Sequence, residues 1–219
     1  MADDGLGASA WPDVGSPVLV VPVGSFEQHG PHLPLDTDTR IAIALSEALC
    51  AAEPACALGP TLTVTASGEH HGFPGTLSIG TDVTAQVLIE LARSADWAAG
   101  VVYVNGHGGN ALACRQAQAV LAEEGRAVLV WAPHVRGGDL HAGATETSLM
   151  LHLAPHLVRR AAAVAGPQPT LAALVTHGVR ALSPSGVLGE PAKASAGAGS
   201  ALLAALADDL VATVRRWLG

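Results

Sequence analysis

The sequence predicts an α/β fold in which a mainly parallel sheet carries helices on both faces. Short apolar runs alternate with segments of helical periodicity, and this alternation is typical of βαβ units. With 219 residues, the chain is long enough for one domain with a sizeable core. Hydrophobic residues make up 49% of it, which excludes global disorder.

Short apolar runs predict the strands. The clearest are residues 18–23, 101–104 and 127–131, each a buried-type run rich in Val and Leu. Weaker runs at 62–64 and 161–165 predict two further short strands. The order of these runs along the chain predicts that the helices fall between them.

Helices are predicted where apolar residues recur three or four positions apart. Val83, Val87, Leu88 and Leu91 show this spacing, which places them on one helical face. The stretch 166–198 is rich in Pro, Gly and Ser and is predicted as mostly loop. The predicted helices cover residues 41–51, 83–95, 111–121, 145–153 and about 200–218.

The chain is predicted to form one domain over residues 17–219, with a flexible tail before it. Residues 1–16 contain Asp3, Asp4 and Asp13 and no apolar stretch, which does not fit a signal peptide. No apolar run reaches the ~18 residues that a membrane span requires. We therefore expect a cytoplasmic protein with no membrane partner.

Charge and cysteine content narrow the function further. The net charge of −8 argues against nucleic acid as a partner, because phosphate binding requires a basic surface. The three cysteines, Cys50, Cys56 and Cys114, are odd in number and lack a motif spacing. This pattern does not suggest a disulfide framework.

Three segments rich in metal-ligand side chains follow directly after predicted strands, at residues 24–38, 105–110 and 139–146. Since ligands bind outside the carboxyl ends of parallel strands, these segments are expected to meet at one edge of the sheet. Their candidate functional residues are Glu27, His29, Asp38, His107, His141 and Glu146.

The candidate residues suit a pair of divalent ions. Glu27 and His29 point to the same side of an extended segment, because side-chain direction there has a period of two. Carboxylate with imidazole suits Zn, Mn or Fe(II). The carboxylates of Glu27, Asp38 and Glu146 supply three negative charges, which two divalent ions and one hydroxide would balance.

A competing motif lies in the second segment. Gly106, Gly108 and Ala111 follow a strand and open a helix, as in the loose dinucleotide fingerprint G-x-G-x-x-G/A. The next strand ends at residues 131–133, Trp-Ala-Pro, where an acidic ribose ligand would be needed. The fingerprint is therefore weak, although free N–H groups at this helix start could hold an oxyanion.

The chain resembles the creatininase family of metal-dependent amidohydrolases in three motifs. These are G-S-x-E-x-H-G-P-H-L-P-L-x-T-D over residues 24–38, N-G-H-G-G-N over 105–110 and H-A-G-x-x-E-T over 141–147. The resemblance spans roughly residues 18–150. It implies two divalent metal ions per subunit (Zn, Fe(II) or Mn) and a symmetric homo-oligomer.

The resemblance also implies roles for single residues. Glu27, Asp38 and His107 would hold one metal, His29, Asp38 and a glutamate the other, and Asp38 would bridge the two. His141 corresponds to the family's catalytic base. Creatininase itself uses a glutamate two residues after the histidine of the second motif, where this chain has Gly109. Glu146 is the substitute, and creatinine itself is put in doubt as the substrate.

Longer stretches are similar to a peptidase branch of this family, over residues 22–42, 67–70, 73–80 and 186–191. That similarity implies cleavage of a modified precursor peptide, with release of its crosslinked C-terminal Val-Tyr core. Four residues are expected to line the substrate pocket, although a structural role is equally open for the first two: Glu69, His70, Gly108 and Asn110.

Three other functions remain open from the sequence. An amidohydrolase acting on a small cyclic amide or formamide would use the same ligands. A non-catalytic metal-binding or scaffold protein could have kept them. A purely structural protein is disfavoured, because an inert fold has no need of three carboxylates near three histidines.

Overall fold

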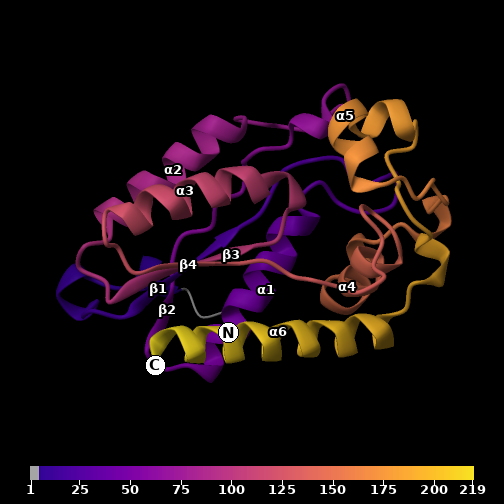
Figure 1. The fold of residues 1–219 in the computed structure, drawn as a ribbon. Coiled ribbons are helices and arrows are strands. Elements are labelled where there is room, and N and C mark those ends of the chain that lie inside the picture. Colours follow the sequence, from indigo (N-terminus) through magenta and orange to yellow (C-terminus); the bar gives the residue numbers. More distant parts are fainter. Residues whose placement is uncertain (1–4) are drawn as a thin grey trace.

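The computed structural model describes residues 5–219 and shows a parallel sheet between two layers of helices (Figure 1). Neighbouring strands follow the order β2-β1-β3-β4, and all three pairings are parallel. The strands are β1 (Val18–Val23), β2 (Cys56–Leu58), β3 (Gly100–Asn105) and β4 (Val128–Trp131). The predicted α/β class is confirmed.

Two helices cover each face of the sheet. In Figure 1, α2 and α3 lie on one side, and α1 and α6 lie on the other. The predicted helices are confirmed with small shifts at their ends. The helices are α1 (Thr37–Ala52), α2 (Thr81–Ser94), α3 (Ala111–Glu123), α4 (Ala144–Leu153), α5 (Leu171–Leu182) and α6 (Ala196–Leu218).

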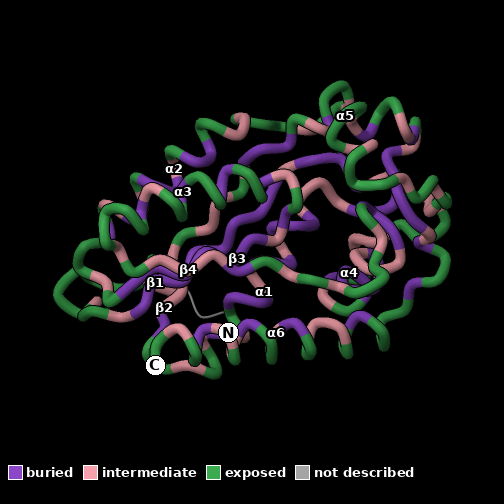
Figure 2. The backbone as a smooth tube through the Cα atoms, viewed as in Figure 1, coloured by how far each residue is buried: buried purple, intermediate pink, exposed green. Residues whose placement is uncertain are grey.

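The alternation of side chains along each strand builds two cores. In β1, Val18 and Val20 pack toward α1 and α6, whereas Leu19, Val21 and Val23 pack toward α2 and α3. Every residue of β1 and β3 is buried, which explains why these strands read as continuous apolar runs. Figure 2 shows the same burial as a continuous purple centre.

The two weaker strand predictions are wrong. The strand that pairs with β1 at this edge of the sheet is β2, and residues 62–64 contribute only a single bridge, between Leu62 and Val23. Gly59 and Pro60 separate that bridge from β2, and proline has no N–H group to continue a ladder. Residues 161–165 form no strand; part of this alanine-rich run belongs to a 3-10 turn, Arg160–Ala162.

The stretch predicted as mostly loop contains α5. Thr170 caps this helix, with its side chain accepting a hydrogen bond from the N–H of Ala173 at 3.2 Å. Gly178 has φ +71° and breaks the helical path. Apolar residues do recur at helical spacing within residues 171–182, but the Pro, Gly and Ser content of the whole stretch favours the loop prediction. The last helix, α6, begins at Ala196 rather than near residue 200. Ser195 caps its glycine-rich first turn, with its hydroxyl oxygen accepting a hydrogen bond from the N–H of Ala198.

The segment predicted as a flexible tail is partly structured. Within the described part, Gly5–Ala8 and Trp11–Asp13 form 3-10 turns, and Leu6 packs against the core beneath α2 and α3. Residues 1–4 of the predicted tail lie outside the described residues.

Helix α6 is long and apolar enough to cross a membrane by length and composition, which the apolar runs of the sequence did not indicate. It packs along α4 and α1, with Leu206, Leu210 and Val214 buried in the core. These contacts make α6 an outer layer of the domain, with one face buried in the core and the rest of the helix less buried.

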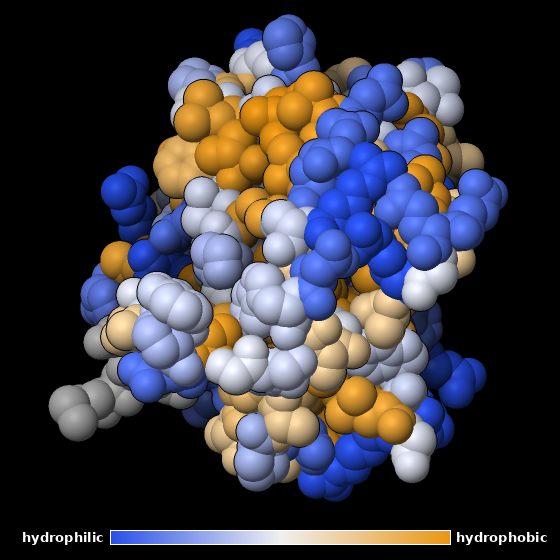
Figure 3. Space-filling model, turned by 90° about the vertical axis from the view of Figure 1, so that its left-hand side faces the viewer, coloured by the Kyte–Doolittle hydropathy of each residue, from blue (hydrophilic) through white to orange (hydrophobic). Residues whose placement is uncertain are grey.

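Several exposed ion pairs lie at the end of the sheet where the strands begin. Arg93 pairs with Glu90 and Glu124, and Arg126 pairs with Glu124 and Asp96. Figure 3 views the molecule from this side and shows hydrophilic areas beside hydrophobic ones. Exposed pairs of this kind contribute little to stability, so the interior packing carries the fold.

We predict that Gly199→Ala destabilises the fold. A Cβ at this buried position in α6 would overlap the carbonyl oxygen of Ser148 in α4. We expect the free energy of unfolding to fall by about 1–3 kcal/mol in urea denaturation. Gly197→Ala is the control, because its added Cβ meets nothing within 4 Å. Equal stability of the two variants would contradict the close packing of α4 and α6.

Candidate metal centre

The loop after β1 supplies three of the candidate side chains, all buried. Glu27 and His29 are fully buried, and Asp38 in the first turn of α1 is 2% exposed. Ser25 donates a hydrogen bond from Oγ to Asp38 Oδ2 at 2.8 Å, which fixes that carboxylate. At Gly24 a side chain would overlap Thr39, so the loop must leave the strand at a glycine.

The loop after β3 supplies His107. Its Nε2 donates to the carbonyl of Ala66 at 2.9 Å, so Nδ1 is the nitrogen that faces Asp38 Oδ2, 2.9 Å away. Because β1 and β3 are neighbours that end in register at Val23 and Asn105, this loop leaves the sheet beside the first one. The segments that follow β1 and β3 therefore leave the sheet at the same edge, as predicted.

The segment after β4 supplies His141 and Glu146. The ring of His141 is 5% exposed, and Glu146 lies in the first turn of α4 with 23% of its side chain exposed. Glu146 Oε2 lies 3.9 Å from His29 Nε2. All three predicted segments thus reach one buried centre.

The ligand atoms form two groups that share Asp38. The first group is Glu27, Asp38 and His107, and the second is His29, Asp38 and Glu146; within each group all ligand atoms lie within 4.8 Å of one another. Asp38 Oδ1 is 3.0 Å from His29 Nε2, while Oδ2 faces His107. Each oxygen of one carboxylate thus serves one group.

Glu27 is the clearest sign that this centre suits cations. Both of its carboxylate oxygens are buried, and neither has a hydrogen-bond partner among the described residues. His70 Nε2 and His107 Nε2 each lie 3.1 Å from one of these oxygens, outside hydrogen-bonding geometry. A buried carboxylate without partners is unfavourable, and a divalent cation would satisfy it with the nitrogen and oxygen donors present.

The electrostatics of the centre reflect several titratable groups packed together away from water. Burial raises the pKa of Glu27 and of Glu146 to about 7. Burial opposes the charge on His29, but the attraction of Asp38 outweighs it and raises the pKa of His29 to about 10. Burial likewise opposes the charge on Asp38, yet His29 and His107 hold its pKa well below the usual range.

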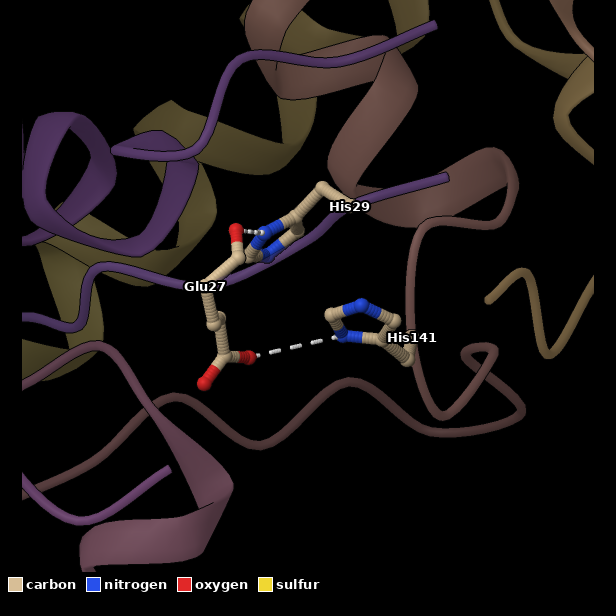
Figure 4. A group of neighbouring side chains, drawn as sticks. All are labelled: Glu27, His29 and His141. Atoms are coloured by element: carbon tan, nitrogen blue, oxygen red, sulfur yellow. Dashed lines mark hydrogen bonds and ion pairs between the residues drawn. The ribbon is translucent and has the colours of Figure 1, made fainter. Parts of the chain in front are cut away.

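A third group consists of Glu27, His29 and His141 (Figure 4). His141 Nδ1 faces Glu27 Oε1 at 3.8 Å, because Nε2 donates to the main-chain carbonyl of Gln28 at 2.7 Å. Burial lowers the pKa of His141 well below its ordinary value, so the ring is neutral. His141 therefore presents a free nitrogen toward the centre.

Gln28, which was not among the predicted site residues, orders the histidines. Its Nε2 donates to His70 Nδ1 at 2.8 Å and to the carbonyl of Gly186 at 3.2 Å. His70 Nδ1 is then an acceptor, and Nε2 carries the hydrogen that faces Glu27. No motif identifies Gln28 in the sequence, although its place between Glu27 and His29 was a signal.

The four residues predicted for the substrate pocket fall into two sets. Gly108 is exposed, and Glu69 is half-buried with its Oε1 3.4 Å from His107 Nε2. His70 is only 2% exposed and lies behind Glu27. Asn110 is fully buried, with its side chain bonded to Ala66, Gly24 and Asn105. Both of these side chains are therefore held in the interior by their contacts.

Gly109, where creatininase has a ligand, is packed against Glu69. A Cβ at position 109 would overlap Glu69 Oε1 and His107 Nε2. Glu69 Oε1 lies 3.4 Å from His107 Nε2. The carboxylate of Glu69 therefore occupies the space that a side chain at 109 would need, and Glu146 reaches the second group from the opposite loop.

Comparison with known proteins is consistent with this geometry. A family model described as creatinine amidohydrolase matches residues 8–214. The mycofactocin precursor peptide peptidase of Mycobacterium tuberculosis is 46% identical over 218 residues, covering 93% of this chain and 86% of the relative. That of Mycolicibacterium smegmatis is 44% identical, covering 97% and 91%. The creatinine amidohydrolase of Pseudomonas putida is 29% identical, covering 66% and 67%.

Solved creatininase structures share the fold. A mutant creatininase of Zn-Zn type has a TM-score of 0.76 and 25% identity and covers 96% of both chains. A creatininase with Mn has a TM-score of 0.74 and 25% identity, covering 96% of this chain and 97% of that one.

We predict that metal uptake releases more protons at pH 6 than at pH 8. With pKa values raised to about 7, Glu27 and Glu146 are largely protonated at pH 6 and ionised at pH 8. An incoming cation must displace those protons, so affinity falls as the pH drops through 7. Calorimetry in buffers of different ionisation enthalpy should give about one to two additional protons at pH 6. Equal release at both pH values would contradict these pKa values.

Proposed function

The chain belongs to the creatininase family, and from this premise we propose that it is a metal-dependent peptidase acting on a modified precursor peptide. It would hydrolyse the amide bond before the crosslinked C-terminal Val-Tyr pair and release that core. The observation that carries the proposal is the pair of buried ligand groups sharing Asp38. The curated relatives named as mycofactocin precursor peptide peptidases favour the peptide substrate.

The proposed ligands divide the work between two ions. Glu27, Asp38 and His107 would hold one, and His29, Asp38 and Glu146 the other. Bound divalent ions would supply positive charge that polarises an amide carbonyl and would lower the pKa of a water molecule. The creatininases with Zn and with Mn support these metals, and the donor set also accepts Fe(II).

His141 is the proposed proton carrier. Its Nε2–H is committed to the carbonyl of Gln28, which leaves Nδ1 free and directed toward the centre. A neutral imidazole in this position can accept a proton from the attacking water and pass it to the leaving amine. The fixed hydrogen bond holds the ring in the required tautomer.

Glu69 and Gly108, which are half-buried and exposed, are the proposed substrate contacts. Glu69 offers carboxylate oxygens that can accept hydrogen bonds from main-chain N–H groups of a peptide. Gly108 carries no side chain, and a Cβ there would meet nothing within 4 Å, so a peptide can approach its backbone. The remaining two predicted contacts, His70 and Asn110, would act by supporting the ligands.

The small-amide alternative is less favoured. The creatinine amidohydrolase of Pseudomonas putida is more distant than the two peptidases, and it covers less of the chain. We retain from the family resemblance two further proposals, a symmetric homo-oligomer and a cytoplasmic location. A single monomeric species in light scattering at micromolar concentration would contradict the oligomer.

We predict that Glu27→Ala and His107→Ala each abolish metal binding at the first group and peptide turnover. Removing one ligand leaves the ion too few donors to be held, so turnover should fall by at least about a hundredfold. Metal content by mass spectrometry and cleavage of the crosslinked precursor, assayed beside creatinine and a formamide, provide the readouts. Glu90→Ala, on the exposed surface of α2, is the control. Full activity in either ligand variant would overturn the assignment.

We predict a different result for His141→Ala. Both ions should remain bound, whereas kcat should fall by about 10²–10⁴ because the proton carrier is lost. Metal content and single-turnover rates separate the two effects. Loss of an ion in step with activity would instead make His141 a ligand, as the third group of Glu27, His29 and His141 permits.

A further inference from the structure

The turn that carries the last two site residues is strained. Ala142, between His141 and Glu146, has φ +50°. Among the described residues it is the only one other than glycine with a positive φ. It is fully buried, and its N–H donates to Glu146 Oε2 at 2.5 Å. A left-handed alanine is unfavourable and persists only where its surroundings impose it.

The carboxylate of Asp139 is placed to impose this turn. Its Oδ2 accepts hydrogen bonds from the N–H of Ala144 and of Glu190, both at 2.9 Å. Its Oδ1 accepts from the hydroxyl of Thr145 at 3.1 Å. One side chain therefore binds the start of α4 and a segment about fifty residues later.

Two glycines make room for this carboxylate. A Cβ at Gly143 or at Gly189 would overlap the Asp139 side chain. Gly143 belongs to the strained turn, and Gly189 belongs to the later segment. Both segments therefore need a glycine where they pass the Asp139 side chain. An incidental hydrogen bond at the surface would not impose that requirement.

The later segment contacts His141 directly. Leu188 donates its N–H to the main-chain carbonyl of His141 at 2.9 Å. Gly186 packs against the amide of Gln28, whose main-chain carbonyl holds the His141 ring. Position and tautomer of His141 therefore depend on a segment that Asp139 anchors through Glu190.

We propose that Asp139 is a positioning residue for the site. It locks the 139–146 turn and the 186–190 segment together, and in doing so it sets Glu146 as a ligand of the second group and His141 as the proton carrier. The inference rests on the proposed function, because it assigns Asp139 an effect on metal binding and proton transfer. It requires no contact between Asp139 and the substrate.

The test is Asp139→Asn, which keeps the size of the side chain but replaces one acceptor oxygen with an amide donor. In either orientation the amide nitrogen would face groups that now donate to the carboxylate: the N–H groups of Ala144 and Glu190, or the N–H and hydroxyl of Thr145. In calorimetric titration with Zn²⁺, we expect the first site to be unchanged and the second to weaken about 10–100-fold. In turnover of the crosslinked peptide, kcat should fall at least about tenfold while KM changes less than about threefold.

Two further variants make the test specific. Asp82→Asn removes an acidic residue from the exposed first turn of α2 and should bind two ions like the wild type. If Asp139→Asn does not fold, Thr145→Ala, which removes one donor to Asp139, should still weaken the second site severalfold. Wild-type affinity and kcat in the folded Asp139 variant, or in Thr145→Ala where it stands in, would overturn the inference. A wild type that takes up no ions would overturn the proposed function as well.

Discussion

The site depends on one buried carboxylate, that of Asp38. Its two oxygens face different histidines, His29 and His107, and Ser25 fixes one of those oxygens by a hydrogen bond. Because Asp38 lies in the first turn of α1, it joins that helix to the loops that follow β1 and β3. A carboxylate at this depth is stable only in contact with positive charge, so packing and chemistry are coupled here.

The rest of the centre extends the same constraint. Glu27 is buried and Glu146 is half-buried beside Asp38, and desolvation raises the pKa of both to about 7. Three acidic groups so close together repel one another when ionised, and positive charge beside them offsets that repulsion. The fold accepts this local conflict, as it accepts the strained Ala142, and such departures from local preference are typical of functional sites.

The sequence predicted the elements of the fold whose apolar runs or helical periodicity are clear. Strands β1 and β3 are central, fully buried apolar runs, and β4 is a partly buried apolar run at the edge of the sheet. Their prediction needed only composition and length. Strand β2 is only three residues long, which is too short for a clear pattern. Helix α5 has apolar residues at helical spacing, but the surrounding Pro, Gly and Ser residues favoured a loop prediction there. The run at 161–165 shows that apolar residues without a neighbouring strand do not make one.

For the site, the sequence by itself determined which residues gather. Because the carboxyl ends of parallel strands meet at one edge of a sheet, the three segments that follow the strands were predicted to lie together. Because side chains alternate along an extended segment, Glu27 and His29 were predicted to point to the same side. Tertiary structure alone decided how these residues are shared and oriented. Asp38 divides its oxygens between two groups, Gln28 sets the tautomer of His141, and Asp139 fixes the turn that carries Glu146. The physical reason is that these contacts join segments far apart in the chain, whose approach no local pattern encodes.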